Sequence, residues 1–164
     1  NQPIDWTQTG NVTTMYGMFQ NAPASNQSLA SLDTSNVTDM ASMFQSATNF
    51  NGDVSTWDTS KVTTMAQMFY QASKFNNASG ISGWKTGNVT TMSRMFNYAL
   101  LFNKPLAFDS STNAWNTGKV TDFSYMFQYN PACNQPIDAW DVSKATNMSR
   151  MFEGATISLL LDFR

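Results

Sequence analysis

This chain of 164 residues has no histidine and one cysteine, Cys133. The absence of histidine removes the side chain that most often serves as a general base or a metal ligand near neutral pH. A single cysteine excludes an internal disulfide and a thiolate metal cage. Glycine-rich phosphate loops and acidic calcium loops are also missing, and the acidic residues are spread singly along the chain. We therefore expect no enzyme activity, no metal and no cofactor.

Charge is scarce, because only 12 % of the residues are charged, about half the usual share. Residues 1–60 hold five aspartates and no lysine or arginine, a net charge of −5, whereas residues 61–164 hold nine basic and six acidic residues, a net charge of +3. The total of −2 offers no basic surface to a nucleic acid. No apolar run approaches the ~20 residues that a membrane-spanning helix needs, so no membrane span is expected.

One pattern accounts for most of the large apolar residues. The run W-x-T-[S/G]-[N/K]-V-T-x-M-x-x-M-F-x-x-A-x-x-F-N occurs six times, and it is most complete in Trp57–Asn76. All eleven methionines fall in two columns of this repeat, with Phe123 replacing one of them. The phenylalanine that follows the second methionine column recurs at intervals of 25, 25, 27, 31 and 25 residues, at Phe19, Phe44, Phe69, Phe96, Phe127 and Phe152.

The spacing of apolar residues predicts a short helix in each repeat. Counted from the valine, apolar residues stand at 0, +3, +6, +7 and +10, and at 100° per residue they share one arc of about 120°. The segment from Phe50 to Trp57 is rich in turn formers and predicts a short strand and a turn. The predicted fold is therefore an α/β solenoid with about six coils of ~25 residues, each a short parallel strand plus a short helix. An all-β right-handed solenoid is the alternative.

We assign residues 1–156 to the repeat domain and residues 157–164 to a terminal strand or cap. The first residues, NQPIDW, resemble the middle of a repeat. We therefore expect the chain to lack its native N-terminal segment, and the missing signal peptide carries no information.

The repeat resembles the BspA-like family, formerly described as a mycoplasma protein of unknown function. Its run W-D-T-S-x-V-T-x-M-x-x-M-F-x-x-A-x-x-F-N is nearly intact also in Leu32–Asn51 and Trp84–Asn103. The resemblance implies a leucine-rich-repeat-like solenoid in a secreted or surface-anchored protein, with adhesion and protein binding as its roles. It brings no catalytic residues.

Positions outside the repeat columns are the candidates for recognition. Arg94 and Tyr125 share one free column, Tyr98 and Tyr129 share another, and Phe108 belongs to a longer insertion. Exposed tyrosine and arginine are common anchors of protein interfaces. The alternative is that these aromatic residues only cover the flank of the predicted helices.

Four further columns or positions have structural or functional interpretations. The asparagine column Asn26, Asn51, Asn76, Asn103 and Asn134 is expected to form a structural ladder, and Cys133 to be a small buried apolar residue in a phenylalanine column. Of six N-x-S/T motifs, the one at Asn77 lies in an insertion and is the best candidate for glycosylation. The threonine column that follows the valine could form an ice-binding face.

Two functions of different kinds follow. The favoured one is a non-catalytic module for protein recognition or adhesion, extracellular or at the cell surface, with a protein or a glycan as partner. The alternative is a structural subunit of a larger assembly, in which neighbouring chains cover the ends of the solenoid. Ice binding is a minor alternative.

Overall fold

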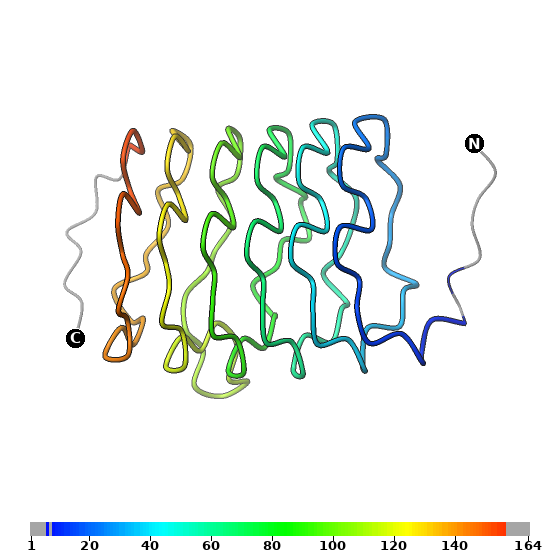
Figure 1. Cartoon of the computed structure of the whole chain (residues 1–164), viewed down its shortest axis with the longest axis horizontal. Helices are drawn as coiled ribbons and strands as arrows, with labels where there is room; N and C mark the ends of the chain where they lie inside the picture. The colour runs from blue at the N-terminus through cyan, green and yellow to red at the C-terminus, as the bar shows by residue number, and fades with distance from the viewer. Residues whose placement is uncertain (1–5, 7, 157–164) are drawn as a thin grey trace.

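The computed structural model describes residue 6 and residues 8–156. Six coils stand side by side along the long axis, and the chain enters at one end of the stack and leaves at the other (Figure 1). The described residues form no helix, and strand pairing is reduced to isolated bridges. Five parallel bridges join neighbouring coils through one residue each, at Thr14, Asp39, Thr64, Thr91, Asp122 and Asn147.

The predicted α/β fold is therefore wrong. The segment expected to be helical in the third coil, from Val62 to Ala72, is instead a series of turns that follows the bridge residue Thr64. The strands of the all-β alternative are not formed either. The terminal strand or cap expected at 157–164 lies outside the described residues.

Each coil contains two tight turns, and each turn has one residue with a left-handed backbone conformation. In the third coil, the N–H of Met68 donates to the carbonyl of Met65 at 3.2 Å, and that of Ala72 donates to Phe69 at 3.0 Å. The third residue of these turns has a positive φ, +60° at Gln67 and +58° at Gln71. A positive φ at the third position is the geometry of a type II turn. The same two columns have positive φ in all six coils, at Gly17/Asn21, Ser42/Ser46, Gln67/Gln71, Arg94/Tyr98, Tyr125/Tyr129 and Arg150/Gly154.

Every second N–H group from Met65 to Gln71 donates to a carbonyl of the next coil. Gln67 donates to the carbonyl of Ser93 at 2.8 Å, and Phe69 donates to that of Met95 at 2.9 Å. Within-coil turn bonds and coil-to-coil bonds thus alternate along the chain. Backbone groups that are buried must be paired, and here the stack of coils pairs them.

This arrangement explains why the helix prediction failed. An isolated helix of about three turns is marginal in water, and the threonine, serine and asparagine around the stripe are weak helix formers. A helix would also keep its hydrogen bonds to itself, whereas the turns connect each coil to its neighbour. The apolar spacing fits both structures, since the turns also direct Val62, Met65 and Phe69 into the core, where each is fully buried.

The core consists of aromatic columns that continue from coil to coil. Phe44, Phe69 and Phe96 stack with ring centroids 5.4 and 5.7 Å apart, within 4° of parallel. A second phenylalanine in the second, third and fourth coils lies close to the first, as Phe75 does at 3.9 Å from Phe69, between centroids. The buried indole of Trp84 donates its N–H to the carbonyl of Val54 in the preceding coil at 3.1 Å. The aromatic residues of the repeat motif therefore recur because they pack in the core.

Polar columns complete the stack. The predicted asparagine ladder is confirmed, because Oδ1 of Asn51 accepts the backbone N–H of Asn76 at 2.8 Å, and the same bond links successive asparagines from Asn26 to Asn134. A buried threonine column forms a second ladder, in which Oγ1 of Thr86 donates to the carbonyl of Asn116 at 2.8 Å.

Candidate functional site

The exposed large apolar side chains gather in two places. Tyr16 and Met18 belong to the first coil, and the others, in the fourth and fifth coils, are Tyr98, Leu100, Leu101 and Tyr129, exposed by 38 to 54 %. We call these last four residues the tyrosine–leucine patch. Large exposed apolar side chains that lie together on a soluble protein commonly mark an interaction site.

The sequence prediction identified the tyrosines of this patch and missed the leucines. Leu100 and Leu101 follow Tyr98 in the chain, where the third coil has Ser73 and Lys74. This change from polar to apolar residues at free positions of the repeat was the available signal.

The predicted residues Arg94, Tyr98, Tyr125 and Tyr129 form two contacting pairs. The rings of Tyr98 and Tyr129 lie 4.9 Å apart, between centroids, and are tilted by 37°. The guanidinium of Arg94 lies over the ring of Tyr125 at 4.7 Å, and that of Arg150 lies 6.0 Å from the same ring. Such cation–π contacts orient long side chains that would otherwise move freely. All four predicted residues occupy the two left-handed columns.

A polar network adjoins the patch. The buried Asn97 donates from Nδ2 to Oε1 of Gln128 at 2.9 Å, and Gln128 donates to the carboxylate of Glu153. Glu153 also accepts from the hydroxyl of Tyr129 at 3.4 Å and pairs with Arg150 at 3.7 Å. The negative charge of Glu153 raises the pKa of Tyr129, and desolvation contributes in the same direction. The phenol of Tyr129 thus lies beside a carboxylate that accepts its hydrogen bond.

Phe108 does not join this group. It lines a pocket of about 230 Å³ with Asn116, Thr117, Ala139 and Asp141, and none of the four clustered residues lines that pocket. The insertion that carries it forms a small loop closed by an antiparallel bridge between Asp109 and Ala114. Phe108 is therefore a separate candidate.

The glycosylation candidate Asn77 is half-buried and hydrogen-bonded. Its Nδ2 donates to the carbonyl of Asn51 at 2.7 Å, and its Oδ1 accepts from the N–H of Ser79 at 3.0 Å. Because a glycan is attached through Nδ2, modification at this position requires the bond to Asn51 to break.

The threonine column considered for ice binding is exposed in all six coils, at Thr13, Thr38, Thr63, Thr90, Thr121 and Thr146. It lies on the bridge-forming segment and not on the first turns of helices. From the second coil on, each hydroxyl donates to the carbonyl of the preceding threonine at 3.0 to 3.2 Å. A neighbouring column carries lysines and asparagines, so charged side chains interrupt the flat surface.

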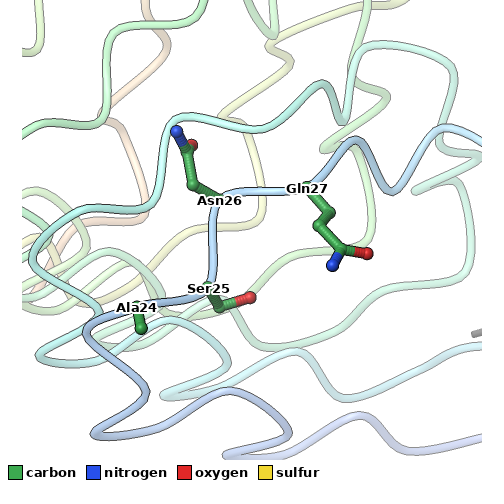
Figure 2. Close-up of a pocket in the computed structure, with 4 residues that line it drawn as sticks. All are labelled: Ala24, Ser25, Asn26 and Gln27. Atoms are coloured by element: carbon green, nitrogen blue, oxygen red, sulfur yellow. The ribbon is translucent and has the colours of Figure 1, made fainter. Parts of the chain in front are cut away.

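Two residues that replace phenylalanine in the second phenylalanine column have different surroundings. Ser25 stands where later coils have phenylalanine, and a pocket of about 400 Å³ lies along Ala24–Gln27 of the first coil (Figure 2). Cys133 is 2 % exposed, and burial raises its pKa to about 11. The interpretation of Cys133 as a buried apolar residue is confirmed.

Two further observations concern the part of the chain that the structure describes. None of its segments forms a helix of the length and hydropathy needed to cross a membrane. Nor do three His, Cys, Asp or Glu side chains converge there as metal ligands would.

Comparison with known proteins gives one result. The model of the family described as "Mycoplasma protein of unknown function, DUF285" matches residues 1–107 and, in a second match, residues 77–158. The two matches together cover nearly the whole chain, and the chain belongs to this family. No curated protein and no solved structure matches the chain.

Proposed function

We propose that this member of the family is a non-catalytic recognition module that binds a protein partner through the tyrosine–leucine patch. The observation that carries the proposal is the gathering of Tyr98, Leu100, Leu101 and Tyr129 on adjacent coils. The core columns are buried and leave only free positions for recognition. Aromatic residues beside arginine are the usual energetic centres of protein interfaces.

The surroundings of the patch support a protein partner. Arg94 and Arg150 bracket Tyr125, and the Glu153 network holds Tyr129 in place. Side chains that are ordered before binding lose less entropy on association. A glycan is the second kind of partner, since exposed tyrosine rings can also stack on sugars.

The proposed location of this activity is a cell surface or the space outside the cell, and its proposed role is adhesion. This part of the proposal rests on the resemblance of the repeat, seen most fully in Trp57–Asn76.

The test is affinity capture from the envelope and culture medium of the producing cells, with wild-type protein and the double variant Tyr98→Ala/Leu101→Ala. Loss of two central anchors is expected to reduce captured partners by more than ~30-fold, since each such residue is worth about 2 kcal/mol or more. The matched control is Gln71→Ala/Lys74→Ala, which changes the same two columns in the third coil. Equal capture by wild type and the patch variant, measured by quantitative mass spectrometry and repeated with purified partner, would refute the proposal.

A structural role in a larger assembly is the second candidate, and one observation favours it. In the turn segment that begins at the first methionine column of each coil, the coil-to-coil hydrogen bonds run from the N–H groups of one coil to the carbonyls of the next, so the first and sixth coils differ at the outer edges of this segment. Among the described residues, the carbonyls of Tyr16 and Met18 and the N–H groups of Arg150 and Phe152 have no hydrogen-bond partner. Such edges can pair with another chain. Analytical ultracentrifugation that shows a monomer at all concentrations would exclude self-assembly of this kind.

A further inference from the structure

Tyr98 and Tyr129 are a pair of like side chains in register. They occupy the same column of the fourth and fifth coils, with ring centroids 4.9 Å apart, and they are exposed by 39 and 38 %. Stacked coils place equivalent atoms of equivalent side chains close together. The two phenol rings are therefore in contact, and both are partly accessible to solvent.

No other tyrosine of the chain has this arrangement. All five tyrosines are described, and Tyr98 and Tyr129 form the only tyrosine pair in ring contact. The ring of Tyr125 contacts guanidinium groups, and Tyr16, in the first coil, is the most exposed at 62 %. Tyr98 and Tyr129 thus differ from the other tyrosines in the closeness of their two rings and not in their exposure to solvent.

We propose that Tyr98 and Tyr129 form an intramolecular dityrosine cross-link when the protein meets a one-electron oxidant, such as a peroxidase supplied with hydrogen peroxide. Each phenol loses one electron and its hydroxyl proton and becomes a phenoxyl radical. The two ortho carbons then share their unpaired electrons in a new C–C bond. Each ortho hydrogen moves to the oxygen of its ring and restores the phenol. The protein has then lost two hydrogen atoms overall, and one hydrogen peroxide has become two waters.

The neighbourhood of Tyr129 suits this chemistry. Its hydroxyl donates to Oε1 of Glu153 at 3.4 Å, so a carboxylate is in place to take the proton that leaves with the electron. The exposed ring tips must rotate from their tilted contact into an edge-to-edge position, and solvent on their outer side leaves room for that rotation. The product would join two coils whose linked residues are 31 positions apart, and it would restrict separation of these coils. This inference does not depend on the proposed function.

The experiment treats dilute purified protein with horseradish peroxidase and hydrogen peroxide and then isolates the monomer. We expect dityrosine fluorescence in the monomer, a mass lower by two hydrogen atoms, and a cross-linked peptide pair that contains Tyr98 and Tyr129. The variant Tyr98→Phe should lose all three signals. The matched control is Tyr125→Phe, in the other left-handed column of the fifth coil, and this variant should keep all three signals.

Two results would overturn the proposal. One is a monomer that carries no dityrosine while covalent dimers linked through Tyr16 accumulate. The other is an intramolecular product that persists in Tyr98→Phe. Because Tyr→Phe removes only a hydroxyl, circular dichroism of the variant can show that the fold is retained and that a lost signal reflects lost chemistry.

Discussion

Two left-handed positions in each coil shape this molecule at the scale of single residues. In the described part of the chain, glycine occupies these positions only in the first and last coils, at Gly17 and Gly154, and elsewhere they hold larger residues such as Gln67. A left-handed backbone costs an L-residue roughly 1–2 kcal/mol. The coil-to-coil hydrogen bonds must therefore stabilise each of these turns by more than its strain.

Replacement of Gln67 by glycine should accordingly be neutral or stabilising, by up to about 1 kcal/mol, because glycine adopts this conformation without strain. The adjacent Ala66 does not have a positive φ, and Ala66→Gly should destabilise by about 0.5–1 kcal/mol. Urea unfolding of both variants measures the two effects. Equal destabilisation by both substitutions would show that Gln67 is not left-handed in solution.

Ladders of equivalent side chains are the elements that hold the coils together. In the buried threonine column, Thr86 is fully buried and donates to the carbonyl of Asn116 in the next coil. In the exposed column, Thr90 donates through both its N–H and its hydroxyl to the carbonyl of Thr63. The two columns look alike in the sequence, yet only in the first does removal of the hydroxyl leave a partly buried carbonyl without a donor.

Thr86→Val should therefore cost about 1–3 kcal/mol of unfolding free energy, because it removes a hydrogen bond and leaves the carbonyl of Asn116 unpaired. Thr90→Val is the matched control, and its cost should stay below about 0.5 kcal/mol, since the N–H of Thr90 still binds Thr63. Denaturant unfolding monitored by tryptophan fluorescence compares them. Similar losses in the two variants would contradict the distinction between the columns.

The insertion loop at 109–114 is an element closed by one carboxylate. Asp109 accepts from the N–H and the hydroxyl of Ser111, at 2.9 and 2.7 Å, and from the hydroxyl of Thr112 at 2.7 Å. These hydrogen bonds, those from the hydroxyls of Ser111 and Thr112 above all, lower the pKa of Asp109 from 3.8 to about 2. Because the folded pKa is depressed, the contribution of these bonds is complete above pH 3.8 and is lost as the pH falls towards 2.

A carboxyl NMR titration should thus find Asp109 with a pKa of about 2, with the amide signal of Ser111 changing in the same range. The variant Asp109→Asn should abolish that pH dependence of Ser111. A titration of Asp109 near 3.8 would mean that the loop is not closed in this way.

The whole molecule is a stack in which position along the chain becomes position along an axis (Figure 1). The uneven charge of the sequence, −5 over residues 1–60 and +3 over residues 61–164, thereby becomes a difference between the two ends of the stack. Such a field can orient an approaching charged partner, and salt would screen it. The tyrosine–leucine patch lies in the basic part, which favours an acidic partner surface.

The sequence was sufficient to predict the number of coils, the core columns and the asparagine ladder. These depend on which residues recur, and each recurrence is visible in the chain. It could not decide between helix and turns, because apolar residues such as Val62, Met65 and Phe69 become buried in either structure. Whether the segment forms a helix or turns depends on hydrogen bonds between neighbouring coils, and these bonds cannot be inferred from the sequence of one repeat. Gly17, Asn21 and Gly154 in the left-handed columns were the one local hint.

The candidate site was predictable in part for a related reason. Tyr98 and Tyr129 were identified because they share a column outside the motif. Leu100 and Leu101 were missed although they stand at free positions of the repeat, and the structure shows that these two are exposed by 43 and 54 %.

The central claim is that the repeat folds as a stack of turns, so that only residues outside the repeat motif are available to bind a partner. Far-UV circular dichroism of the purified protein tests this claim most directly. A stack of turns without helices predicts a spectrum that lacks the double minimum of an α-helix. Six helices of three turns would give that double minimum clearly. A helical spectrum would contradict the coil structure and, with it, the placement of the tyrosine–leucine patch.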